Sequence, residues 1–149
     1  MFASSVKRKR PASPEHKLQA SLVAWHEQCV ARNSCELIAI PNGGFRRKSV
    51  AGKMKAEGQR KGATDLVLAL PEGRSLWIEV KLDDTPTTKR TDLSAEQRAF
   101  RTKILSLGHS HRVVRSIEQY RAVIEEFGVP HLERAPLRRA GEPRRSAPE

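Results

Sequence analysis

The sequence predicts an α/β domain in which helices cover both faces of a mixed β-sheet. Short apolar runs bounded by Gly, Pro and Asp alternate with longer segments that carry helix caps and stop signals. Strands that are mixed with helices in this way build a sheet covered by helices. We therefore expect the order helix, strand, short helix, strand, strand, helix, strand, helix.

The first half of the chain supplies two helices and one strand. Ser13 is a suitable N-cap with Pro14 at the first helical position, and apolar residues at helical spacing follow to about residue 32. The run ELIAI at 36–40 is a short strand that the following PNGG stops. Residues 48–57 then form a short basic helix.

The second half supplies three strands and two helices. Strands at about 64–70 and 75–82 are joined by the turn PEGR. Ser94 caps a helix that runs through Leu107, and a Gly stops it. The segment HRVVR is the last strand, and residues 116–127 form the last helix.

Length and composition predict one folded domain between two tails. The chain has 149 residues, of which 38% are hydrophobic and 30% charged. Residues 1–13 and 131–149 are rich in basic residues, Pro, Ser and Ala without periodicity, so we expect them to be disordered. The folded domain is expected over residues 14–130.

Several classes of protein are disfavoured by what the sequence lacks. Cys29 and Cys35 are too few for a disulfide framework, and no Cys/His cluster has zinc-binding spacing. The sequence has no apolar signal region and no apolar run long enough to span a bilayer. We expect a soluble protein of a reduced cytoplasm.

The positive charge is concentrated in one stretch of the expected domain. The net charge of +11 favours a polyanionic partner. Between residues 45 and 61 seven cations stand against one Glu, and we expect these seven to bind DNA phosphates: Arg46, Arg47, Lys48, Lys53, Lys55, Arg60 and Lys61. Asn42, in the turn before them, is expected to contact a phosphate or brace the loop. The alternative is a solvated basic face.

Three charged residues interrupt the two central strands: Asp65, Glu79 and Lys81. Because side chains alternate along a strand, Glu79 and Lys81 share one face. A hairpin whose turn is centred between residues 72 and 73 would place Asp65 opposite Val80 and close to Glu79. The sequence therefore predicts two neighbouring carboxylates beside a lysine.

Paired carboxylates of this kind indicate a divalent metal site. Two carboxylates a few ångströms apart repel each other unless a cation lies between them. Hard oxygen ligands select Mg²⁺ or Mn²⁺, which can polarise a phosphoryl oxygen and activate water. Lys81 would orient that water or stabilise the developing charge. The alternative is a structural cap at Asp65 and a surface pair of Glu79 with Lys81.

The same residues resemble a known family. Asp65, Glu79 and Lys81 resemble the PD-(D/E)XK nuclease signature, with Thr64 in place of its proline. Five blocks in order resemble the virus-type replication-repair nuclease (VRR-NUC) family: IPNGG at 40–44, KAEGQRKGATDLVLAL at 55–70, LWIEVK at 76–81, LSAEQRAF at 93–100 and GHSHRVVRSIEQYRAVIEEF at 108–127. The resemblance covers about residues 14–127 and implies a restriction-endonuclease-like fold.

The resemblance also implies roles for individual residues. As metal ligands it implies Asp65, Glu79, the Val80 backbone carbonyl and Glu15; as catalytic residues it implies Asp65, Glu79, Lys81 and Gln97. Glu15 and Gln97 also have purely structural interpretations, the first at a helix N-terminus and the second in a capping box with Ser94.

The activity that the resemblance implies is a Mg²⁺- or Mn²⁺-dependent endodeoxyribonuclease that hydrolyses phosphodiester bonds. It further implies selectivity for branched DNA such as Holliday junctions or flaps, a role in DNA repair, homodimeric assembly and a bacterial or phage-infected cytoplasm. It implies no organic cofactor and no membrane partner. Two alternatives remain: an endonuclease without structure preference, and a noncatalytic nucleic-acid-binding module.

Overall fold

The structure is a computed structural model that describes residues 12–41 and 48–132. The described helices and strands follow one another in the predicted order. They are α1 (Pro14–Cys29), β1 (Glu36–Ala39), α2 (Lys48–Ala56), β2 (Leu66–Ala69), the 3₁₀ turn η1 (Pro71–Gly73), β3 (Ser75–Val80), α3 (Ala95–Ser106), β4 (Ser110–Val114) and α4 (Ile117–Glu126). Both tails predicted as disordered lie almost wholly outside the described residues.

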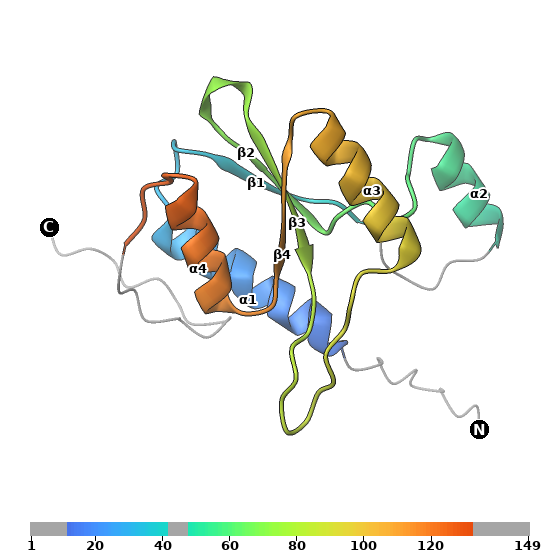
Figure 1. Cartoon of the computed structure of the whole chain (residues 1–149), viewed down its shortest axis with the longest axis horizontal. Coiled ribbons are helices and arrows are strands. Elements are labelled where there is room, and N and C mark those ends of the chain that lie inside the picture. Colours follow the sequence, from blue (N-terminus) through green and yellow to red (C-terminus); the bar gives the residue numbers. More distant parts are fainter. Residues whose placement is uncertain (1–11, 42–47, 133–149) are drawn as a thin grey trace, which may run out of the picture.

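The sheet is mixed and has helices on both faces, which confirms the predicted α/β class. Its strand order is β1-β2-β3-β4, with antiparallel pairing across the first three strands and parallel pairing between β3 and β4. In Figure 1, α1 and α4 lie together on one side of the sheet, and α3 lies on the other side. The two faces of β3 therefore meet different helices.

The hydrophobic core lies on the α1 and α4 side. It takes alternate side chains of β2 and β3, including Leu66 and Ile78, which are fully buried. Trp25 of α1 and Tyr120 of α4 pack edge to face there, with ring centroids 5.9 Å apart. Because β3 alternates, its remaining side chains face α3 and are available for a site.

The helices begin where the sequence predicts. The Ser13 hydroxyl accepts a hydrogen bond from the His16 backbone N–H, and Ser94 caps α3. α1 ends at Cys29 rather than near residue 32, because Val30 adopts an extended conformation and forms a β-bridge with His131.

The predicted register of the central hairpin is wrong by one residue. Leu66 pairs with Ile78, so the register carries Asp65 opposite Glu79 and not Val80. The reason is the loop: Leu70 pairs with Arg74 across three residues, whereas the predicted register pairs Pro71 with Arg74 across two. Glu72 fits into this loop by taking a left-handed conformation, with φ 64° and ψ 28°. A one-residue slip exchanges the faces of a strand, so the observed register puts Asp65 on the same face as Glu79.

Gly62 fixes the distance between the loop before β2 and the first turn of α3. Its φ is +74°, and a Cβ atom at this position would lie 2.3 Å from the Glu96 carbonyl oxygen and 2.7 Å from the Gln97 backbone nitrogen. Only glycine allows this approach of two backbones.

None of the described helices is both long enough and apolar enough to cross a membrane.

We expect Glu72→Asn to stabilise the protein relative to Glu72→Gln. Both substitutions replace the carboxylate by an amide, but asparagine tolerates the left-handed conformation better. The free energy of unfolding should be higher for the Asn variant by up to about 1 kcal/mol. Urea denaturation measures the difference, and equal values would contradict the loop conformation.

We expect Gly62→Ala to destabilise the protein more than Gly73→Ala. Gly73 has nearly the same φ, +72°, but a Cβ atom there would meet nothing within 4 Å. The difference between the variants therefore isolates the contact with α3, and overpacking of this kind costs about 1–3 kcal/mol. Urea denaturation of both variants checks this, and equal losses would show that α3 is not held at Gly62.

Candidate active site

Asp65 and Glu79 meet on the sheet face that α3 covers. They are opposite each other in the extended β2–β3 register, and opposite residues of an antiparallel pair lie with their Cβ atoms about 4.5–5.5 Å apart. The Asp65 Oδ2 atom accepts a hydrogen bond of 2.8 Å from the Val80 backbone N–H. The carboxylate thus occupies the position where the ladder of backbone hydrogen bonds would have continued.

The carboxylate of Glu79 is fixed through one of its two oxygens, Oε1. Its side chain is buried, with 2% of the residue exposed. The Oε1 atom accepts a hydrogen bond from Gln97 Nε2 and lies 3.5 Å from Lys81 Nζ. The Oε2 atom is buried and accepts no hydrogen bond from the described residues, although the Glu79 side chain as a whole hydrogen-bonds with Asp65, a contact that opposes the rise in the pKa of Asp65 caused by burial. An unpartnered buried carboxylate oxygen is costly, so its presence calls for an explanation.

The pKa values of both acids are raised. Burial is the main cause for Glu79, and repulsion from Asp65 adds to it, which raises the pKa of Glu79 from its ordinary value of 4.5 to about 8. Burial also raises the pKa of Asp65, although the hydrogen bond from Val80 and the charge of Lys81 oppose the shift. Strongly shifted carboxyl groups of this kind are typical of functional sites.

These residues fit a hard divalent cation. The unpartnered Glu79 Oε2 supplies a free oxygen, and Asp65 supplies a second carboxylate beside it. In a strand the N–H and C=O of a residue project to the same edge, so the Val80 carbonyl faces the edge occupied by Asp65. Within the described part of the chain, no third Asp, Glu, His or Cys joins a group that could hold a metal. Such a site suits Mg²⁺, which binds through one or two carboxylates and retains waters.

The Gln97 side chain completes a helix cap and also contacts the acid pair. Its Oε1 atom accepts from the Ser94 backbone N–H at 2.8 Å, which completes a capping box. Its Nε2 atom donates to Glu79. The cap therefore fixes the orientation of the amide that holds the acid.

Glu15 lies near the acid pair but is engaged elsewhere. Its charge contributes to the raised pKa values of both Asp65 and Glu79. Its Oε1 atom accepts a hydrogen bond of 3.0 Å from the Thr91 hydroxyl. In this arrangement Glu15 is close enough to influence the site electrostatically, and Thr91 holds it.

Thr91 and Arg115 are not among the predicted site residues. Both form hydrogen bonds to the backbone that follows Lys81. The Thr91 hydroxyl also accepts from the Leu82 N–H at 2.9 Å, directly after Lys81. The Arg115 guanidinium donates to the carbonyl oxygens of Leu82 and Thr91. No spacing in the sequence signals these contacts, because they join residues far apart in the chain. Thr64, at the position where the resembled signature has proline, is buried and donates to the Leu66 carbonyl at 3.3 Å.

The described part of the predicted DNA-binding set lies on α2 and the turn after it. Lys55, Arg60 and Lys61 line an open hollow of about 610 Å³, together with Gln59 and Gly62. Lys53 is exposed and forms a 3.9 Å ion pair with Glu57. Lys48 begins α2. The other predicted members, Asn42, Arg46 and Arg47, lie outside the described residues.

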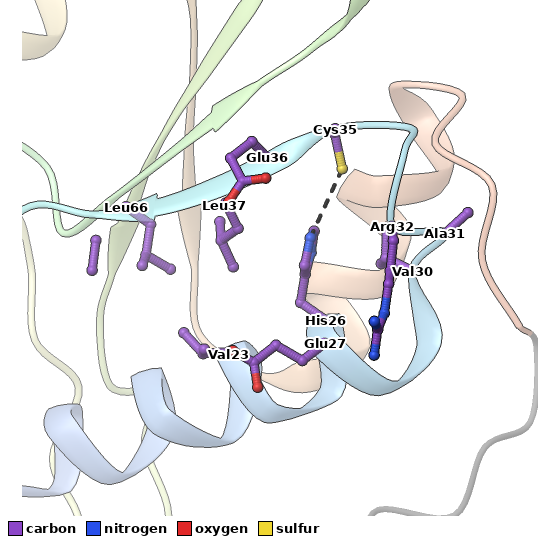
Figure 2. Close-up of a pocket in the computed structure, with 11 residues that line it drawn as sticks. Val23, His26, Glu27, Val30, Ala31, Arg32, Cys35, Glu36, Leu37 and Leu66 are labelled. Atoms are coloured by element: carbon purple, nitrogen blue, oxygen red, sulfur yellow. Dashed lines mark hydrogen bonds between the residues drawn. The ribbon is translucent and has the colours of Figure 1, made fainter.

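A second polar cluster lies in a pocket between α1 and β1 (Figure 2). The pocket, of about 540 Å³, contains Cys35 and His26, whose Sγ and Nε2 atoms lie 3.8 Å apart. The His26 Nδ1 atom makes a 2.7 Å hydrogen bond with the Tyr120 hydroxyl. Burial lowers the pKa of His26 and raises the pKa of Cys35. Both groups are therefore held neutral, which disfavours an activated cysteine nucleophile.

Comparisons with known proteins agree with this architecture. The sequence matches no family model and no curated protein. Among solved structures, one named "VRR_NUC domain protein" has a TM-score of 0.58 at 18% identity, over 79% of this chain and 90% of that one. Another, named "VRR_NUC domain", has a TM-score of 0.52 at 22% identity, over 78% of this chain and 99% of that one. The resemblance found in the sequence blocks is thus confirmed at the level of the fold: this chain folds as VRR_NUC domains do.

Proposed function

We propose that this protein is a metal-dependent endodeoxyribonuclease of the VRR-NUC family that hydrolyses phosphodiester bonds. The observation that carries the proposal is the pair of adjacent carboxyl groups of Asp65 and Glu79, in which the buried Glu79 Oε2 atom accepts no hydrogen bond from the part of the chain that the structure describes. A pure binding module gains nothing from acidic groups that face phosphates. A site that holds Mg²⁺ or Mn²⁺ does, because the cation reverses the local charge.

Each site residue has a proposed role that follows from its position. Asp65, Glu79 and the Val80 carbonyl would hold the cation, and Glu15 would reach it through water or by leaving Thr91. The cation, when bound, polarises the phosphoryl oxygen and lowers the pKa of water. Lys81, held 3.5 Å from Glu79 Oε1, would orient the attacking water or stabilise the charge that develops on the phosphate. Gln97 would keep Glu79 in position through its hydrogen bond.

The basic hollow beside the site would hold the DNA backbone. Lys55, Arg60 and Lys61 line it, and its edge includes Gly62, three residues before Asp65. Lys53, Lys48, Arg46, Arg47 and Asn42 complete the proposed phosphate-binding set, and the last three lie outside the described residues. Such contacts bind DNA without reading its sequence, so affinity should fall steeply with salt.

Selectivity for branched DNA, homodimeric assembly and a repair role are the finer parts of the proposal, and they rest on the VRR-NUC resemblance. The main rival is an endonuclease with the same chemistry and no structure preference. Cleavage of linear, nicked, flap and four-way substrates at matched salt separates the two, because only a structure-selective enzyme cuts the branched substrates preferentially.

We expect Glu79→Gln to abolish cleavage while sparing DNA binding. The amide retains the size of the side chain but supplies a much weaker metal ligand, so the cleavage rate with Mg²⁺ should fall by about two to four orders of magnitude. Gel assays measure the rate, and anisotropy without metal measures the affinity for DNA. Glu118→Gln, at an exposed position of α4, is the matched control. Equal cutting by the Glu79 variant would refute the assigned site.

We expect the metal-free protein to lose stability as pH rises from about 4.5 to about 8. In this range the unfolded state releases the Glu79 proton while the folded state keeps it, because the folded-state pKa is raised to about 8. Glu79→Gln should remove this loss. The difference in thermal midpoint between this variant and wild type, measured in EDTA, should therefore increase with pH. Glu126→Gln is the control, since its hydrogen bond with Arg112 lowers the pKa of Glu126. A parallel pH dependence in wild type and the Glu79 variant would contradict the raised pKa.

A further inference from the structure

An aromatic pocket lies directly beside the acid pair. It has a volume of about 420 Å³, and its walls include Met54, Ala63, Trp77 and Phe100. The proposed cleavage chemistry makes no use of this pocket.

The pocket is next to the site along both elements, two residues away on β3 and three residues away on α3. Gln97 contacts Glu79, and Phe100 contacts Trp77, with ring centroids 5.5 Å apart. Residues 97 and 100 lie on one face of the helix, and residues 77 and 79 on one face of the strand. Two strand residues on the same face are about 7 Å apart. That separation is close to the spacing of a phosphate and a neighbouring base.

The aromatic surface is preformed. The Trp77 indole N–H donates to Ser75 Oγ at 3.1 Å, and this oxygen is 2.8 Å from His109 Nδ1. The indole is thus fixed by the hydrogen bond of its N–H group and by the ring contact with Phe100. Trp77 is only partly buried and lines the pocket, so a flat ligand can reach it without a change in the core.

The pocket shares part of its wall with the basic hollow. Gln59 and Arg60 line both, and Glu57 is the one acidic residue among the described residues that line the aromatic pocket. A polyanion on Lys55, Arg60 and Lys61 would pass the mouth of an aromatic pocket. Nucleic acid combines these two chemistries in one ligand, since each backbone phosphate is followed by a base with an aromatic face.

We propose that this pocket binds one unpaired nucleobase of the DNA strand whose phosphate lies at Asp65 and Glu79. The inference rests on the proposed nuclease function and deepens it. A base inside a duplex is stacked and paired, whereas a base at a branch or in a single strand enters at little cost. The pocket would therefore favour substrates with unpaired bases next to the cut.

The test measures binding to branched DNA in EDTA, where no cleavage occurs. An abasic nucleotide is placed in turn at each unpaired position, and anisotropy gives the dissociation constants. Wild type should lose about tenfold in affinity at a single position, as expected for one stacked base. Phe100→Leu and Trp77→Leu should lose this discrimination, and Trp77→Phe, which keeps an aromatic face, should retain it.

Phe127→Leu is the matched control. Phe127 is also partly buried, but it packs beneath Arg112 at the end of α4, away from the pocket. This variant should discriminate like wild type. Equal affinity of wild type for every abasic substrate, or equal loss of discrimination in the Phe127 variant, would overturn the inference.

Cleavage by the same wild-type protein with Mg²⁺ separates the two proposals. Cutting without any abasic effect on binding removes the base pocket and leaves the nuclease. A position-specific abasic effect without cutting supports the pocket and removes the nuclease.

Discussion

The burial of Glu79 opposite Asp65 is the constraint around which the rest of the site is arranged. Two acids on neighbouring strands repel each other, and burial makes their charged forms costlier still. The protein offsets only part of this cost: Lys81 and Gln97 both engage Glu79 Oε1, and Val80 donates to Asp65. Glu79 Oε2 is left out of these contacts. An arrangement that fixes one oxygen and leaves the other without a donor is what the proposed metal site would require.

Much of the scaffold holds these two carboxylates in register. The three-residue hairpin loop puts them on one face, and it does so at the expense of a left-handed Glu72. Gly62 brings the loop before β2 against the start of α3, and the capping box at Ser94 orients Gln97. Arg115 fixes the backbone on both sides of the loop that follows Lys81. The hairpin loop lies at the far end of β2 and β3 from the acids and acts through the register, whereas Gly62, Gln97 and Arg115 act close to them.

Local signals in the sequence predict where the helices and strands lie along the chain, but not how they are placed relative to one another. Ser13 and Ser94 mark helix starts because capping acts within three residues. The common face of Glu79 and Lys81 is likewise a local property, because side chains alternate along a strand. The hairpin register was beyond reach, since PEGR is compatible with a two- or a three-residue loop, and the choice depends on how β2 and β3 pack. The roles of Thr91 and Arg115 depend on contacts between distant segments, and no local pattern encodes them.

Gln97 can cap a helix and hold a site residue with the same side chain, so its structural interpretation does not exclude the proposed functional one. Its carbonyl oxygen caps α3, and its amide nitrogen holds Glu79. A residue that does only the first could be replaced by glutamate, which also completes a capping box. Glutamate would, however, place a third carboxylate against two acids whose pKa values are already raised. The acid pair therefore requires a neutral donor at the position where helix capping alone would accept either residue, and the chemistry of the site restricts the choice of an ordinary helix cap.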